Sequence, residues 1–251
     1  IKEILFKHKK LLKRKIWVLF KEVPRKNLQP DKARDLLKKK FVMDPYKPDL
    51  RVRVDILNKN LLISEEITEN ELLPYRKHNV SFALDQRLAY CMARLINPEP
   101  RQTILDPFCG AGTLPIEAAF LYGGKTTILG SDLKEENIDI SEKNAKNARV
   151  RQHIRFFQHD ARAINKIPEK VDYIVTELPY QFKQENLDNL YENFIHSAEQ
   201  ILNKNGSIIA IVDDALHFRK IVDNSNLGVI EQRKLLKGGY HPRLFILKTN
   251  I

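Results

Sequence analysis

The pattern of apolar and polar positions predicts different secondary structure in the first part of the chain and in the rest. Near the start, Ile16 to Phe20 is a five-residue apolar run whose β-branched and aromatic content predicts a buried strand. A helix is predicted from Asp31 to Phe41. Within residues 51–57, apolar side chains at positions 52, 54 and 56 alternate with charged side chains at positions 51, 53 and 55, and residues 58–60 turn the chain into a further strand at Leu61 to Ile63. These elements predict a small α+β domain.

After Arg76, predicted strands alternate with predicted helices, which is typical of parallel β-α units covered on both faces. No long helix separates the last two strands, so one of them is expected to run antiparallel. We therefore expect a doubly wound, seven-stranded α/β domain. Its predicted helices cover residues 83–96, 114–121, 135–148 and 187–202, and its predicted strands cover residues 103–105, 127–130, 154–157, 171–176, 207–212, 229–236 and 244–247.

A polar stretch from Ser64 to Pro74 separates the predicted α+β domain from the region of alternating strands and helices, and it is typical of a hinge or linker. The predicted organisation is a basic domain over residues 1–68, a linker over 69–78 and the α/β domain over 79–251. The chain begins with Ile1 rather than Met. We therefore expect the first domain to be incomplete at its N-terminus.

Composition then narrows the class of protein. Hydrophobic residues make up 43% of the 251 positions, which is near the usual share for folded globular chains. No apolar run approaches the roughly 20 residues that span a bilayer, so we expect no membrane association. Two cysteines, Cys91 and Cys109, suit a reducing compartment, and we expect a cytoplasmic protein. The seven histidines show no metal-ligand spacing, and no metal is expected.

The positive charge is concentrated at the start of the chain. Residues 1–48 hold 16 of the 43 Lys and Arg residues but only 5 of the 32 Asp and Glu residues, so the whole net charge of +11 lies there. Clustered cations bind polyanions and release condensed counterions, and we expect RNA to bind this segment. A solvated lysine-rich face is the alternative for a single run such as Lys38 to Lys40.

A glycine-bearing loop, Asp106 to Thr113, follows the first strand of the predicted sheet and leads into a helix. This is where doubly wound folds bind ligands. Asp132 and Asp160 come just after the next two strands, so three carboxylates follow three successive strands. Taken singly, each Asp is more often a helix cap or a turn residue, but three carboxylates after three successive strands are much less easily explained in that way. Pro115 occupies the place of the third glycine of a dinucleotide fingerprint, which disfavours a nicotinamide enzyme.

The loop, with Leu114 to Ala119 after it, resembles the first motif of class I S-adenosylmethionine-dependent methyltransferases, specifically the RNA methylases that carry a THUMP domain. Residues 16–67 are similar to the later part of THUMP, an RNA-binding module that in this family recognises the acceptor end of tRNA. The resemblance implies S-adenosylmethionine as cofactor. It implies a cofactor site made of Ser81, Phe82, Asp106, Pro107, Phe108, Cys109, Gly110, Gly112, Thr113, Asp132, Leu133, Asp160, Ala161 and Glu177.

Within that site, the resemblance sets Asp106, Gly110 and Gly112 beside the methionine part of the cofactor. Asp132 would bind the ribose hydroxyls, and Asp160 with Ala161 the adenine. Ser81 and Phe82 match the segment that closes over the methionine end, and a helix cap and a core aromatic are the alternative for this pair.

Thr176 to Tyr180 resembles the Asn/Asp-Pro-Pro-Tyr motif of enzymes that methylate exocyclic amines, and the implied catalytic residues are Glu177, Leu178, Pro179 and Tyr180. A guanine N2 amine is a weak nucleophile, so its N–H bonds need acceptors that hold it in line with the methyl group. Glu177 replaces Asn or Asp, and its extra methylene moves the oxygens by more than about 1 Å, a misplacement that can lower a rate about 100-fold.

The leading hypothesis is therefore methyl transfer to an exocyclic amine of RNA, most specifically guanine N2 in tRNA. The alternative is a non-catalytic RNA-binding protein that keeps a methyltransferase fold, because Glu177 and Gln181 depart from the family motif. A covalent mechanism through a cysteine is disfavoured, since Cys109 lies in the cofactor loop and Cys91 falls within a predicted helix.

Overall fold

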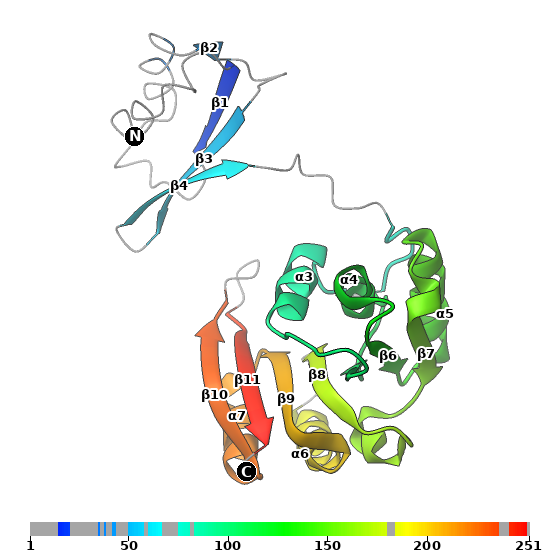
Figure 1. The fold of residues 1–251 in the computed structure, drawn as a ribbon. Helices are drawn as coiled ribbons and strands as arrows, with labels where there is room; N and C mark the ends of the chain where they lie inside the picture. Colours follow the sequence, from blue (N-terminus) through cyan, green and yellow to red (C-terminus); the bar gives the residue numbers. More distant parts are fainter. Residues whose placement is uncertain are drawn as a thin grey trace. The chain divides into compact units, whose positions relative to one another are not determined.

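The computed structural model describes residues 15–20, 35, 38, 42–43, 50–57, 60–66, 75–80, 83–179, 184–235 and 241–249. The chain divides into two compact units, Ile1–Glu71 and Leu72–Ile251 (Figure 1).

The described part of the first unit contains four strands, β1 (Lys15–Phe20), β2 (Val42–Met43), β3 (Leu50–Leu57) and β4 (Asn60–Glu66). They form a sheet in the order β2-β1-β3-β4, in which β1 is parallel to both of its neighbours and β3 forms an antiparallel hairpin with β4. Val52 and Val54 are buried, as the alternation of β3 predicts.

The predicted hinge begins too early. Ser64 to Glu66 belong to β4, because they pair with residues 51–53 of β3. Most of the helix predicted over residues 31–41 lies outside the described residues, although Asp35 and Lys38 are helical. Most of the basic segment 1–48 also lies outside them, so its role in binding RNA stays a prediction.

Seven strands of the second unit form one mixed sheet: β5 (Thr103–Asp106), β6 (Thr127–Asp132), β7 (Ile154–Gln158), β8 (Val171–Glu177), β9 (Leu202–Val212), β10 (Leu227–Lys234) and β11 (Arg243–Thr249). Their order is β10-β11-β9-β8-β5-β6-β7. Strands β5 to β9 pair in parallel, whereas β11 is antiparallel to both β9 and β10. The predicted doubly wound sheet with one antiparallel strand is confirmed.

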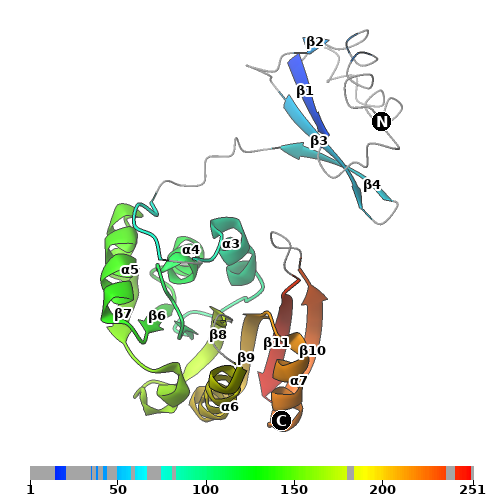
Figure 2. The same cartoon turned by 180° about the vertical axis from the view of Figure 1, so that it is seen from behind.

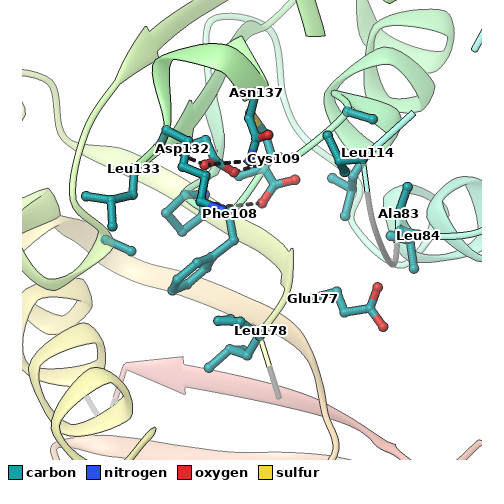
Figure 3. Close-up of a pocket in the computed structure, with 18 of the residues that line it drawn as sticks. Ala83, Leu84, Phe108, Cys109, Leu114, Asp132, Leu133, Asn137, Glu177 and Leu178 are labelled. Atoms are coloured by element: carbon teal, nitrogen blue, oxygen red, sulfur yellow. Dashed lines mark hydrogen bonds between the residues drawn. The ribbon is translucent and has the colours of Figure 1, made fainter. Parts of the chain in front are cut away.

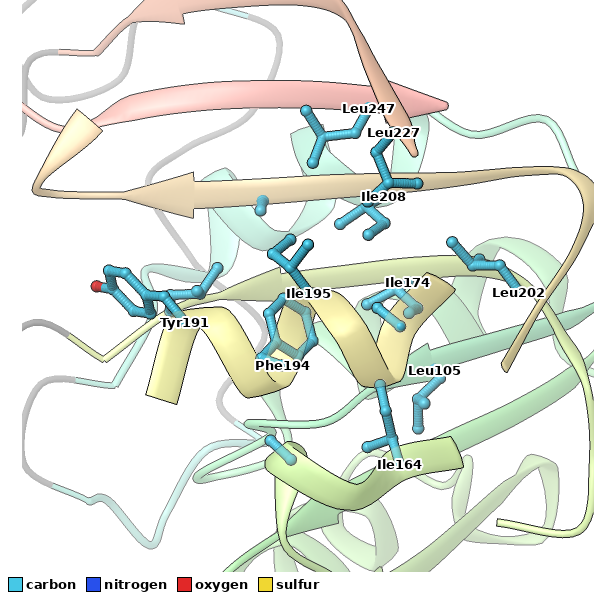
Figure 4. Close-up of a cluster of buried hydrophobic side chains, with 14 of the residues drawn as sticks. Leu105, Ile164, Ile174, Tyr191, Phe194, Ile195, Leu202, Ile208, Leu227 and Leu247 are labelled. Atoms are coloured by element: carbon cyan, nitrogen blue, oxygen red, sulfur yellow. The ribbon is translucent and has the colours of Figure 1, made fainter. Parts of the chain in front are cut away.

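Successive strand residues point to opposite sides of the sheet, and both faces carry apolar side chains. Helices therefore cover both faces. Ile104 and Ile128 pack with the helices α3 (Gln86–Arg94), α4 (Thr113–Tyr122) and α5 (Glu135–Asn147). Leu105 and Leu129 pack on the other face with the 3₁₀ segment η3 (Ala161–Lys166) and the helices α6 (Gln184–Ile201) and α7 (Ala215–Asp223). Figure 2 shows α6 and α7 in front of the strands, and Figure 4 shows the core beneath α6.

Some elements differ from the prediction for local reasons. Helix α3 begins at Gln86 rather than Ala83, because the Asp85 side chain caps it by accepting from the backbone N–H groups of Arg87 and Leu88. Helix α7 was missed, although Asp214 caps it in the same way. Strand β9 begins at Leu202 rather than at residue 207, directly after α6 ends at Ile201.

Residues 75–78, predicted as part of the linker, form hydrogen bonds within the second unit. Tyr75 is buried, and its hydroxyl donates to a carboxylate oxygen of Glu117 in α4 at 2.7 Å. Arg76 donates to the Thr113 hydroxyl at 3.2 Å. The segment that enters the second unit is therefore fixed to the start of α4 and to its middle.

Within the described part of the chain, no helix is long and apolar enough to cross a membrane.

Candidate active site

A pocket of about 780 Å³ lies at the carboxyl ends of the central strands of the second unit. The chain proceeds from β5 to β6 and β7 on one side and then crosses to β8 on the other side of β5. Loops diverge at such a reversal of strand order and leave a crevice where ligands bind. The pocket is of the size of a small-molecule site, roughly 300–1,000 Å³.

The loop between β5 and α4 needs glycine at two positions. Gly110 and Gly112 have backbone φ angles of +53° and +78°, a left-handed conformation that side chains disfavour. A Cβ atom at Gly112 would also lie 3.0 Å from the Cβ atom of Ser141 in α5. The glycines therefore let the loop turn and pass close to α5, and Gly110 lines the pocket.

Two buried side chains of α5 hold this loop. The Ser141 hydroxyl donates to the Gly110 carbonyl at 2.8 Å. The Asn144 amide donates to the Ala111 carbonyl at 3.0 Å and to the His78 carbonyl at 2.8 Å, and its oxygen accepts from the His78 N–H at 3.1 Å. Asn144 thus joins the glycine loop to residues 75–80, of which Asn79 and Val80 line the pocket.

Sequence reasoning missed Ser141 and Asn144. The available signal was two polar side chains, three residues apart, on the face of α5 that carries Ile138 and Ala145. Polar groups on a buried face normally have hydrogen-bond partners, so such a pair marks a contact with a polar segment.

Asp106 ends β5 and is 4% exposed. One of its carboxylate oxygens accepts from the Thr176 hydroxyl at 2.7 Å and from the Phe108 N–H at 3.1 Å. Burial raises the pKa of Asp106 to about 7, against the two hydrogen bonds, and the nearby charges of Asp132 and Glu177 raise it further. A positively charged ligand in the pocket would favour the ionised form.

Asp132 ends β6 and faces the glycine loop. One oxygen accepts from the Gly110 N–H at 3.0 Å, and the other accepts from the Lys134 N–H at 3.0 Å and the Asn137 amide at 2.9 Å. Figure 3 shows Asp132 and Asn137 together at one side of the pocket. A carboxylate accepts about four hydrogen bonds, so these three among the described residues leave capacity for a ligand hydroxyl.

Asp160 follows β7 and also lines the pocket, but an adjacent arginine engages it. Both of its oxygens accept from the Arg162 guanidinium, the shortest of these bonds being 2.6 Å, and one accepts from the Arg162 N–H at 2.9 Å. These bonds to Arg162 lower the pKa of Asp160. Arg162 itself lines the pocket, a feature that sequence reasoning missed.

The turn after β8 forms the opposite side of the pocket. Glu177 is the last residue of β8 and pairs with Ile211 of β9. The Leu178 N–H donates to the Ile211 carbonyl at 2.9 Å, and the Leu178 side chain is fully buried. In Figure 3, Glu177 and Leu178 lie across the pocket from Asp132 and Asn137.

The pocket therefore collects most of the residues predicted from the sequence, although their roles stay predictions. Gly112 is not among its lining residues. Ser81, Phe82 and Tyr180, like Gln181, lie outside the described residues. The predicted residues that line the pocket are Asp106, Pro107, Phe108, Cys109, Gly110, Thr113, Asp132, Leu133, Asp160, Ala161, Glu177, Leu178 and Pro179.

The donor set of this pocket fits an adenosyl sulfonium ligand. Carboxylates approach from three strand ends, and the charges on Asp132 and Glu177 disfavour ionisation of Asp106, so the site favours a cation. The side chain of Leu133 is 59% exposed at the rim and offers an apolar surface to a flat base. A pyrophosphate would meet like charge here, which again disfavours a nicotinamide dinucleotide.

Cys109 is not suited to act as a nucleophile in this pocket. It is buried, and its sulfur lies 3.7 Å from the Ser141 hydroxyl oxygen. Burial raises the pKa of the Cys109 thiol, so the reactive thiolate is disfavoured.

Curated relatives resemble this chain over most of its length. The chain is 28% identical over 210 residues to the tRNA (guanine(6)-N2)-methyltransferase of Thermus thermophilus, covering 82% of this chain and 62% of that protein. It is 26% identical over 242 residues to the protein of the same name from Methanocaldococcus jannaschii, covering 80% of this chain and 64% of that one. The chain thus spans less than two thirds of the length of either relative.

Among solved structures, TrmN from Thermus thermophilus has the same fold, with a TM-score of 0.71 and 24% identity over 94% of this chain and 72% of that chain. A family model described as UPF0020, RMKL-like, methyltransferase domain, matches residues 74–243. This match covers more than half of the chain, including the glycine loop, the strand-end carboxylates and the turn after β8. The chain therefore belongs to the family of RMKL-like methyltransferase domains.

Proposed function

We propose that this protein transfers a methyl group from S-adenosylmethionine to the N2 amine of a guanine in tRNA. One observation carries the proposal: a single pocket at the reversal of strand order is lined by Asp106, Asp132 and Asp160 and by the turn of Glu177 to Pro179. The methyl donor and the amine that accepts the methyl group can therefore meet in one crevice. The named activity of two curated relatives supports guanine N2 as the acceptor.

The strand-end residues would hold the cofactor, which supplies a methyl group on a cationic sulfur when bound. Asp132 would accept from a ribose hydroxyl, because its three bonds among the described residues leave one of about four acceptor positions. Asp106 and Gly110 would lie beside the charged methionine end, and Ala161 with Asp160 beside the adenine. Ser81 and Phe82 stay assigned to the methionine end by resemblance alone.

The turn after β8 would orient the amine. The Glu177 carboxylate would accept one N2–H bond and the Leu178 carbonyl the other, which directs the nitrogen lone pair toward the methyl group. Pro179 fixes the backbone dihedral φ of the turn, and the resemblance assigns a stacking surface for the base to Tyr180. The pocket would accommodate the longer side chain of Glu177.

The basic segment 1–48 would bind the phosphate backbone of tRNA, because all of the excess positive charge of the chain lies there. We also infer a cytoplasmic location. Cys91 and Cys109 are both free, which agrees with a reducing compartment.

Transfer to tRNA followed by nucleoside analysis tests this function. The protein is incubated with methyl-labelled S-adenosylmethionine and unmodified tRNA, and the tRNA is digested to nucleosides. We expect label in N2-methylguanosine, with several methyl groups transferred per protein molecule, and a lower content of this nucleoside in tRNA from a strain lacking the protein. Label in another nucleoside would refute guanine N2 as the target.

A non-catalytic RNA-binding protein is the second candidate, favoured by Glu177 in place of Asn or Asp. It predicts that the protein binds both S-adenosylhomocysteine and tRNA and yet transfers no methyl group. Turnover beyond one methyl group per protein molecule would exclude it.

A further inference from the structure

The hydroxyl of Tyr191 reaches from α6 to the turn after β8. It donates a hydrogen bond to the Pro179 carbonyl at 2.8 Å. Tyr191 belongs to neither end of the pocket described above, and it is absent from the pocket lining. This hydrogen bond ends on the backbone of the turn, so Tyr191 can act on the site only through that backbone.

Packing fixes the Tyr191 ring. Its side chain is fully buried, and its ring meets the Phe218 ring edge to face with centroids 5.7 Å apart, while Phe218 packs in turn against Phe245 at 5.2 Å. Figure 4 shows the ring at the end of the core cluster, with its hydroxyl directed away from the other labelled side chains. A ring held in this way presents its hydroxyl at one position.

The same turn is fixed from the other side. The Leu178 N–H donates to the Ile211 carbonyl at 2.9 Å, and the Leu178 side chain is fully buried. The Leu178–Pro179 segment is therefore held before the proline by β9 and after it by Tyr191. Rotation of either peptide group would break one of these bonds.

Burial raises the pKa of the Tyr191 phenol, and the charges of Asp214 and Asp213 raise it further. The hydroxyl therefore keeps its proton at physiological pH and remains a donor. Buried hydroxyl groups need a hydrogen-bond partner, and the Pro179 carbonyl is the acceptor of the Tyr191 hydroxyl.

We propose that Tyr191 is a positioning residue for methyl transfer, whose hydroxyl fixes the Pro179 carbonyl and thereby aims the Glu177–Pro179 turn at the amine. This inference rests on the proposed function. Loss of the hydroxyl frees the turn by tenths of an ångström to about 1 Å, and misplacement on that scale lowers the rate of transfer without weakening the binding of the cofactor.

The test compares Tyr191→Phe with Tyr122→Phe in steady-state methyl transfer to tRNA. Tyr122 is a matched control, because its hydroxyl also donates to backbone carbonyls, those of Ala93 and Ile96 at 3.0 and 2.8 Å, outside the pocket lining. We expect Tyr191→Phe to lower kcat by about 10- to 100-fold with KM for S-adenosylmethionine unchanged, and Tyr122→Phe to change kcat less than about 2-fold.

Full kcat in Tyr191→Phe would overturn the inference, as would an equal loss in both variants. If the unaltered protein transfers no methyl group, the proposed function fails, and hydrogen exchange at the Leu178 amide then tests separately whether the Tyr191 hydroxyl holds the turn. Faster exchange in Tyr191→Phe than in Tyr122→Phe supports a turn held by the hydroxyl, and equal exchange overturns it.

Discussion

The glycine loop after β5 and the turn after β8 face each other across one pocket and are held by different means. Polar side chains fasten the loop, since Ser141 and Asn144 bind its carbonyls and Asp132 binds its Gly110 N–H. The turn is fixed by burial of Leu178, by the bond from its N–H to the Ile211 carbonyl, and by one hydroxyl from the core.

This contrast shows where the two sides can vary. In the loop, the side chains that bond the backbone also lie near the cofactor side of the pocket. A substitution there would therefore alter both the position of the loop and the binding of the cofactor. In the turn, the backbone is anchored by Leu178 and Tyr191, while Glu177 stands before them at the end of β8. A change at position 177 can therefore alter the chemistry without releasing the turn. The departure at Glu177 is consequently compatible with an active enzyme.

Removal of the Glu177 carboxylate should have the largest effect. Glu177→Ala takes away an acceptor for the amine, and we expect kcat to fall about 100- to 1,000-fold with the binding of S-adenosylhomocysteine unchanged. Glu177→Asn should lower kcat about 10-fold, because the oxygen is withdrawn from the amine. Glu192→Ala, an exposed change on α6, is the control. A higher rate in Glu177→Asn would mark Glu177 as a defect.

Asp132→Ala should test the cofactor side. It removes an acceptor for the ribose and a bond to the Gly110 N–H, and we expect affinity for S-adenosylhomocysteine to fall about 100-fold in calorimetric titration. Asp139→Ala removes the same charge from the exposed surface of α5 and should leave the affinity unchanged. Equal affinities in the two variants would remove Asp132 from the cofactor site.

Asp106→Asn should change how the stability of the protein depends on pH. The folded protein holds the Asp106 proton up to about pH 7, whereas an unfolded aspartate releases it near pH 4, so the stability of the unaltered protein falls as the pH rises through this window. The variant lacks this titration. The unfolding free energy of the variant minus that of the unaltered protein should increase by about 2 kcal/mol between pH 5.5 and pH 8, measured by urea denaturation without ligand. A difference that does not change with pH contradicts the buried, titrating carboxyl.

Ser141→Ala should have the smallest effect. It removes one hydrogen bond to the Gly110 carbonyl, which is worth about 1 kcal/mol, and affinity for S-adenosylhomocysteine should fall about 3- to 10-fold. Ser197→Ala is the matched control, because Ser197 is also a buried serine, bonded to Asn165 of η3. If both variants lose affinity equally, the effect is general and the fastening of the loop by α5 is not specific.

The fold was readable from the sequence because its signals are local. Runs of apolar residues set the strands, and the glycines and the strand-end carboxylates stand at fixed offsets from them, so Asp106 and Asp132 were expected at the strand ends where they lie. Contacts between distant segments gave no local signal. Ser141 is 31 residues from Gly110, and the Tyr191 bond to Pro179 depends on how α6 packs on the sheet.

Asp160 illustrates the limit within a single turn of chain. The sequence predicted a carboxylate directed at adenine, and the residue does line the pocket. Its oxygens are engaged by Arg162, only two residues later. Asp160 caps η3 by accepting from the Arg162 N–H, and this start of η3 brings the Arg162 guanidinium beside the carboxylate.

Donor and acceptor are proposed to meet between the glycine loop and the turn after β8. This central claim is tested most directly by binding S-adenosylmethionine carrying a ¹³C-labelled methyl group and recording isotope-filtered nuclear Overhauser effects. We predict contacts from the labelled methyl protons to the side-chain protons of Glu177 and Pro179. Contacts confined to other parts of the protein, with none to these two residues, would contradict the claim.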